Sequence, residues 1–145
     1  MIYEFCAENV TLLEKAMQAG ARRIELCDNL AVGGTTPSYG VTKAAVELAA
    51  DYDTTIMTMI RPRGGDFVYN DLEVAIMLED IALTAQAGSQ GVVFGALTAD
   101  KKLDKANLEK LVAASKGMEI VFHMAFDELS EQDQLEAIDW LSQAG

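Results

Sequence analysis

Two patterns of hydrophobic and polar positions alternate along the chain. Short runs rich in β-branched and apolar residues are each followed by a stretch in which apolar residues recur at helical spacing. The short runs begin near Ile2, Ile24, Thr55, Gly91 and Glu119, and the helical stretches cover residues 9–19, 42–50, 71–87, 105–114 and 130–143. This order predicts five strand–helix units.

Alternating units of this kind build a parallel sheet, which is either open and doubly wound or closed as a barrel. A unit spacing of about 30 residues, repeated eight times, gives about 240 residues, which is near the usual size of a (β/α)₈ barrel. We therefore expect an α/β fold with a single domain over residues 1–145, forming about five βα units of a TIM-like barrel.

The tripeptide Gln-Ala-Gly ends three of the expected helices, at residues 18–20, 86–88 and 143–145. Glycine is the usual residue after the last turn of a helix. The first two copies lead into a strand, and the third stands at the end of the sequence. We therefore expect the domain to be truncated at its C-terminal end relative to a longer barrel.

The composition is that of a globular protein. Half of the 145 residues are hydrophobic and 23% are charged, which excludes a disordered chain and a membrane-spanning one. The net charge of −12 repels a phosphate backbone, so nucleic acid is not an expected partner. Glu4 and Glu8 interrupt the apolar stretch that a signal peptide would need. We expect a cytoplasmic protein with reduced cysteines and no membrane partner.

Both cysteines stand in the same short pattern, Glu4-Phe5-Cys6 and Glu25-Leu26-Cys27. Side chains alternate along a strand, so acid and thiol share a face, and in a barrel this face is the lumen. Burying carboxylates and thiols is costly unless they are paired, protonated or bound to something. The pattern therefore predicts a functional site, and the alternative is that the cysteines are small buried hydrophobes.

Two more expected strands carry sulfur or nitrogen side chains that face the lumen. Met57, Met59 and Arg61 share one face of the third strand, and His123 points inward from the fifth. Thiolate, thioether and imidazole donors favour Cu(I), whereas the spacings of a closed structural zinc site are absent. The alternatives are that the methionines fill the core and that His123 is a hydrogen-bonded core histidine.

Loops with charged residues follow the second and third strands. Asp28 opens the first loop, and Arg61 and Arg63 flank a turn that continues into Gly64-Gly65. Paired guanidinium groups beside such a backbone predict a site for a carboxylate or a phosphate. The alternative is that the arginines neutralise acids of the barrel mouth. No lysine falls on an expected strand, which argues against a Schiff-base aldolase.

Five segments give the chain a resemblance to a known family. They are Glu25-Leu26-Cys27, Gly33-Gly34-Thr35-Thr36-Pro37-Ser38, Met59-Ile60-Arg61-Pro62-Arg63-Gly64-Gly65-Asp66-Phe67, Val93-Phe94-Gly95-Ala96-Leu97-Thr98 and Phe122-His123-Met124-Ala125-Phe126-Asp127. With these, the chain resembles the copper homeostasis CutC family over all 145 residues. The resemblance implies a TIM-like barrel, a cytoplasmic location, copper ion binding and a role in copper homeostasis. It places the Cu(I) ligands on Cys6 and Cys27. In one departure, Met124 stands where the family usually has arginine.

Two functional hypotheses follow. In the first, the chain is a copper homeostasis protein whose Cys6 and Cys27 bind Cu(I), with Met59 or His123 as a further ligand. Its partner is then the copper ion, and the sequence leaves open whether the chain forms a homo-oligomer.

In the second hypothesis, the chain is a small-molecule enzyme of lyase or isomerase type. Arg61 and Arg63 would hold an anionic substrate at the carboxyl ends of the strands, where barrel active sites form. Proton transfer would then fall to one of Glu25, Asp28 and His123.

Overall fold

A computed structural model of the chain describes residues 1–144. Five parallel strands form one sheet in the order β1-β2-β3-β4-β5. Five α-helices alternate with them, and two 3₁₀ turns, η1 and η2, follow β2 and β5. The strands are β1 (Glu4–Glu8), β2 (Arg23–Cys27), β3 (Thr55–Met59), β4 (Gly91–Phe94) and β5 (Glu119–Phe122); the helices are α1 (Leu13–Gln18), α2 (Tyr39–Ala49), α3 (Asp71–Ala87), α4 (Lys105–Ala114) and α5 (Glu131–Ala144); the turns are η1 (Leu30–Val32) and η2 (Met124–Glu128).

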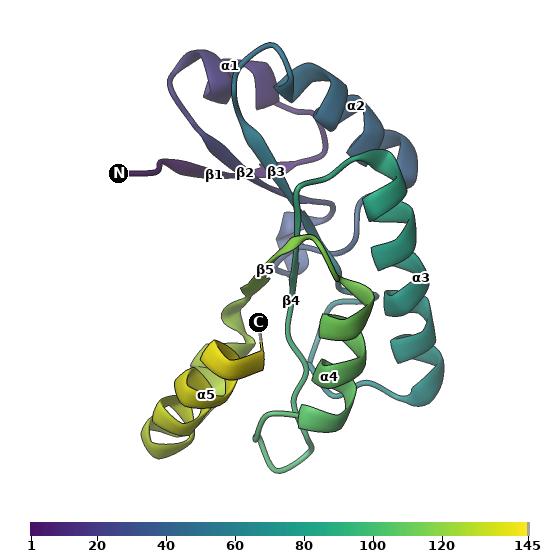
Figure 1. Cartoon of the computed structure of the whole chain (residues 1–145), viewed down its shortest axis with the longest axis vertical. Helices are drawn as coiled ribbons and strands as arrows, with labels where there is room; N and C mark the ends of the chain where they lie inside the picture. The colour runs from purple at the N-terminus through teal and green to yellow at the C-terminus, as the bar shows by residue number, and fades with distance from the viewer. Residues whose placement is uncertain (145) are drawn as a thin grey trace.

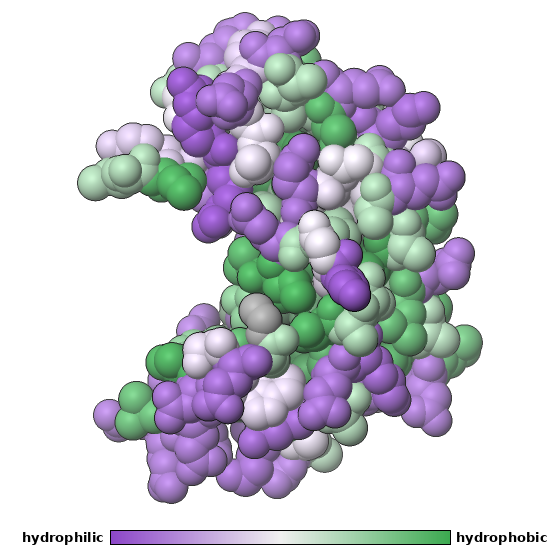
Figure 2. Space-filling model, viewed as in Figure 1, coloured by the Kyte–Doolittle hydropathy of each residue, from purple (hydrophilic) through white to green (hydrophobic). Residues whose placement is uncertain are grey.

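The sheet curves like part of a barrel wall. Helices α1 to α4 follow one another along its outer side, and α5 lies beyond the end of β5, so the molecule is open on its concave side (Figure 1). Figure 2 shows apolar surface gathered in the hollow of that side. The predicted α/β fold is therefore confirmed as a partial barrel.

The core has one layer outside the sheet and a smaller one inside. Outside, one apolar cluster joins β1, β2 and β3 to α1 and α2. A second joins β4, β5 and Ile60, directly after β3, to α3 and α4. Inside, four residues pack together on the concave face: Cys27, Met57, Met59 and Val93. The alternation predicted from the sequence, with Leu26 toward the helices and Cys27 toward the lumen, is confirmed.

The strand register shifts the two Glu-x-Cys segments by two residues. Cys6 lies level with Glu25, and Cys27 lies level with Glu8. The Glu25 row continues through Met57 of β3. Because neighbouring strands of a barrel are staggered, equivalent positions of two repeats need not be level. The thiols are therefore diagonal neighbours.

The predicted element bounds differ most at the N-terminus. Residues 9–12 form turns instead of the first turn of α1, because Asn9 and Leu12 have left-handed backbone angles. At α2 the helix begins earlier than predicted, because the Ser38 side chain accepts a hydrogen bond from the Val41 N–H and caps it. The bounds of α3 and α4 agree with the prediction.

Two of the three Gln-Ala-Gly segments end helices as predicted. Gly20 and Gly88 have φ of +102° and +91°, a conformation that glycine adopts without strain. Gly145, which closes the third copy, lies outside the described residues. Within residues 1–144, none of the helices has the length and apolar character needed to cross a bilayer.

Candidate functional site

Three metal-binding side chains meet on the concave face of β1 and β2. The Cys6 and Cys27 sulfurs are 4.0 Å apart, and one Glu25 oxygen lies 3.7 Å from the first and 3.8 Å from the second. These donors form a nearly equilateral triangle, whose centre lies about 2.2 Å from each corner, close to the length of a metal–sulfur or metal–oxygen bond. Within residues 1–144, this is the one group of three or more His, Cys, Asp or Glu side chains close enough to hold one ion.

One side of the triangle faces solvent, and the other faces the protein interior. Cys6 is exposed on the edge strand β1, Glu25 is half-buried and Cys27 is fully buried. Gly34 covers the interior side, since a Cβ atom at this residue would lie 3.0 Å from the Cys27 sulfur. The Met59 methyl group lies 3.6 Å from the same Cβ position. An ion would thus enter beside Cys6, and a thioether lies near the inner thiol.

Electrostatics favour the protonated forms of all three groups. Burial raises the pKa of the Cys27 thiol, and the negative charges of Cys6 and Glu25 raise it further. The Cys6 pKa is raised by burial and then by Glu25. Burial also raises the pKa of Glu25, with Glu4 adding to the effect. A bound cation would displace these protons and compensate the negative charge.

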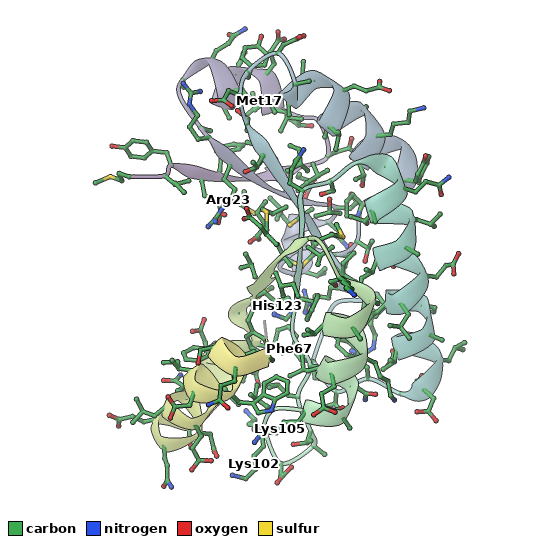
Figure 3. The ribbon with its side chains drawn as sticks, viewed as in Figure 1. Met17, Arg23, Phe67, Lys102, Lys105 and His123 are labelled. Atoms are coloured by element: carbon green, nitrogen blue, oxygen red, sulfur yellow. The ribbon has the colours of Figure 1, made fainter. Side chains whose placement is uncertain are left out.

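His123 comes directly after the carboxyl end of β5 and is 6% exposed. Met59, Val93 and Val121 form one level row across β3, β4 and β5. His123 stands two residues after Val121, so it lies nearer the carboxyl ends of the strands than this row. Its ring centre is 4.9 Å from that of Phe67, and the two side chains lie close together in Figure 3. Burial and then the charge of Arg61 lower the pKa of His123 to about 4, so the ring is neutral near pH 7. Its role as a metal ligand stays a prediction.

Arg61 is almost fully buried and joins two loops. Its guanidinium group donates to the carbonyls of Val32 and Gly34 at 2.8 and 2.9 Å, and to that of Gly65 at 2.8 Å. Its charge lies 4.9 Å above the ring of Phe67. The side chain therefore fixes the loop after β2, including Gly34 behind the Cys27 thiol, to the loop after β3.

Arg63 points elsewhere and pairs with acids. It donates to Glu73, which stands in the first turn of α3, and to Asp66. Hydrogen bonds to Arg63 lower the pKa of Glu73. The two guanidinium groups thus have different surroundings, and their role as an anion-binding pair stays a prediction.

Asp28 is exposed directly after β2, where its backbone pairs with Thr35. Its role in proton transfer also stays a prediction.

Sequence reasoning did not single out Glu73 or Tyr69. The sequence did contain a signal for Glu73, because Asn70 and Glu73 stand at the spacing of a capping box. Both hydrogen bonds of the capping box form in the structure. Tyr69 had no signal, since its burial depends on the packing of α3.

Comparison with known proteins decides the family. The sequence profile of the CutC family matches residues 1–145. The chain belongs to the CutC family. It is 52% identical over 145 residues to the family protein CutC of Enterococcus faecalis and 54% identical to that of Streptococcus pyogenes serotype M6. In both cases the matched region is the whole of this chain and 69% of the relative.

Solved structures agree with this assignment. A crystal structure of CutC from Streptococcus agalactiae, named for copper homeostasis, superposes with a TM-score of 0.93 at 50% identity over 97% of this chain and 67% of that one. The carboxyl transferase domain of Rhizobium etli pyruvate carboxylase gives a TM-score of 0.61 at 13% identity, a likeness of fold alone. The resemblance drawn from the arginine–glycine segment and its companions is confirmed at the level of family and fold.

Proposed function

We propose that this chain is a cytoplasmic copper homeostasis protein that binds Cu(I) through Cys6 and Cys27, with Glu25 as a third donor. The triangle of two sulfurs and one oxygen supports this proposal most directly, because an ion at its centre meets all three donors at bonding distance without movement of the backbone. The copper homeostasis name of the Streptococcus agalactiae relative supports the choice of metal.

The donor set fits a soft cation. Two thiolates select Cu(I) over hard cations such as Mg²⁺ and Ca²⁺, which prefer carboxylate, carbonyl and water oxygens. A closed structural zinc site usually has four protein ligands, whereas this group supplies three. The reducing cytoplasm would keep both thiols available.

Met59 is proposed as an auxiliary donor. It packs in the same buried cluster as Cys27, and both residues face the lumen. A thioether there would shield the inner thiolate and add a soft, uncharged donor. His123, which follows the strand farthest from β1, is a less direct choice.

A Cu(I) titration against a chromogenic chelator tests the site. We expect Cys6→Ser and Cys27→Ser each to weaken Cu(I) binding by about a hundredfold or more, because one remaining thiolate cannot hold the ion. The double variant should add little, as expected for residues that share one ligand. Glu25→Gln should weaken binding by about tenfold, and Met59→Leu by less.

Glu119→Gln is the matched control. Glu119 continues the Glu25 row across β3 and β4 but lies exposed on β5, so its loss should leave Cu(I) affinity unchanged. Unchanged affinity in either single cysteine variant would discard the shared site. A Zn²⁺ titration should show much weaker binding than Cu(I), and tighter Zn²⁺ binding would overturn the choice of metal.

A further inference from the structure

Within residues 1–144, Arg61 is a buried cation without a carboxylate partner. Its side chain is 2% exposed, and none of the ion pairs found within residues 1–144 includes it. The three carbonyls that it contacts satisfy hydrogen bonds but carry no net charge. A buried charge is costly unless it is compensated, and this chain has a large surplus of acids that are placed elsewhere.

Three buried donors near the carboxyl ends of the strands have no acceptor. Among the described residues, the buried side-chain nitrogen and oxygen atoms without a hydrogen-bond partner are Arg61 Nε, Tyr69 Oη and His123 Nε2. The Nδ1 atom of His123 accepts from the Ala125 N–H, so in the neutral ring Nε2 carries the proton. Buried polar atoms are rarely left unpaired, so three in one region call for an explanation.

Arg61 lies close to both other residues, since its charge acts on Tyr69 and on His123. Arg61 and His123 each lie 4.9 Å from the Phe67 ring centre. The charge of Arg61 lowers the pKa of His123, and it also opposes the rise that burial produces in the pKa of Tyr69. Gly95 makes room for the imidazole, because a Cβ at residue 95 would lie 2.7 Å from the ring. One positive charge and the His123 imidazole thus lie beside the same aromatic ring, and Tyr69 lies within the field of that charge.

We propose that Arg61, Tyr69 and His123 form a binding site for a small oxyanion, either inorganic phosphate or the carboxylate or phosphate group of a small molecule. A water molecule would satisfy hydrogen bonds but not the charge, whereas an oxyanion supplies both a negative charge and several acceptor oxygens. The site uses Arg61 and not Arg63, whose charge is already paired with Glu73 and Asp66. It shares no residue with the thiol triangle, although Arg61 also holds Gly34 behind the Cys27 thiol.

His123 is the single histidine of the chain, so its imidazole signals in a ¹H–¹³C NMR spectrum are unambiguous. The experiment titrates the full chain with sodium phosphate, with sodium acetate and with sodium chloride at constant ionic strength and pH. We expect a saturable shift of the His123 signals with an oxyanion and none with chloride. Comparison of phosphate and acetate identifies which oxyanion fits. Binding should also raise the melting temperature in proportion to saturation.

Variants locate the site. Tyr69→Phe removes one hydroxyl and keeps the ring, so the protein should fold and bind the oxyanion about three- to tenfold more weakly. His123→Gln should weaken the thermal stabilisation by the anion similarly. Arg61→Lys keeps the charge but loses the planar fork, and it should nearly abolish binding. Arg63→Gln removes a charge that lies 5.4 Å above the Tyr69 ring but is paired with acids, so it should weaken binding only slightly. Lys43→Gln removes an exposed positive charge of α2; it is the matched control and should bind as the wild type does.

Several outcomes would overturn the proposal. One is the absence of any saturable shift of His123 at millimolar oxyanion. Another is equal affinity in wild type and Tyr69→Phe, which would exclude the phenol from the site. A third is loss of binding in Arg63→Gln with retention in Tyr69→Phe, which would move the anion to the exposed part of the loop. Cys6→Ser should bind the anion normally, and so failure here is distinct from failure of the copper site.

Discussion

At the scale of single residues, burial decides the chemistry of the site more than residue type does. Cys6 and Cys27 occupy the same place in their repeats, yet one is exposed and the other is sealed behind Gly34. Parity along a strand predicted that both thiols and His123 face inward, and this needs only the alternation of side chains. The separation of His123 from the thiols needed the register of all five strands.

His123 should make folding stability depend on pH. A histidine of the unfolded chain titrates near 6.5, and the folded one near 4. Between these values the unfolded state binds more protons, so stability falls as the pH drops from about 6.5 to about 4, by up to about 3 kcal/mol. Urea unfolding at several pH values in an oxyanion-free buffer measures this slope, and His123→Gln should flatten it.

Glu25 acts in the opposite direction within part of the same range. Its pKa is raised in the folded state, so it favours folding as the pH falls and partly masks the histidine. Glu25→Gln should therefore steepen the loss of stability on acidification. Equal slopes in the wild type and His123→Gln would show that another group titrates.

At the scale of elements, helix α3 has the best-defined start. The Asn70 side chain accepts from the Glu73 N–H at 2.9 Å, and the Glu73 carboxylate accepts from the Asn70 N–H at 3.0 Å. Arg63 donates to the same carboxylate, so the helix start and the loop after β3 are fixed together. The spacing of the two residues was readable in the sequence, but the link to Arg63 was not.

Asn70→Ala should therefore destabilise the chain by about 1 kcal/mol, the usual cost of losing such a cap. Asn70→Asp should restore most of this stability, because aspartate caps helices equally well. The control is Glu79→Ala, an exposed position inside α3 where a change within about 0.5 kcal/mol is expected. The free energies come from urea unfolding. An equal loss in Glu79→Ala would refute the capping role.

At the scale of the whole molecule, the partial barrel has two free sheet edges. In the part of the chain that the structure describes, β1 pairs only with β2, and β5 pairs only with β4. Beside the start of β5 lies an open groove of about 650 Å³, lined by residues 112–113 and 115–120. Exposed edges of this kind template association with other chains.

We expect the 145-residue chain to self-associate in solution, with a mass that rises with protein concentration in sedimentation velocity. The net charge of −12 opposes association, and salt screens this repulsion, so association should increase with ionic strength. A monomer with cooperative unfolding at every concentration and salt level would contradict this prediction.

The sequence by itself determined the five units, the parallel sheet, the inward parity of the thiols and the family. These follow from local periodicity and from residues that are adjacent along the chain. Only the tertiary structure decided that Cys6 is a diagonal neighbour of Cys27 and that one oxygen of Glu25 completes the triangle. It also decided that, among the described residues 1–144, Arg61 lacks a carboxylate partner. The physical reason is that register, burial and charge pairing depend on contacts between residues far apart in the sequence, and no local pattern records those distances.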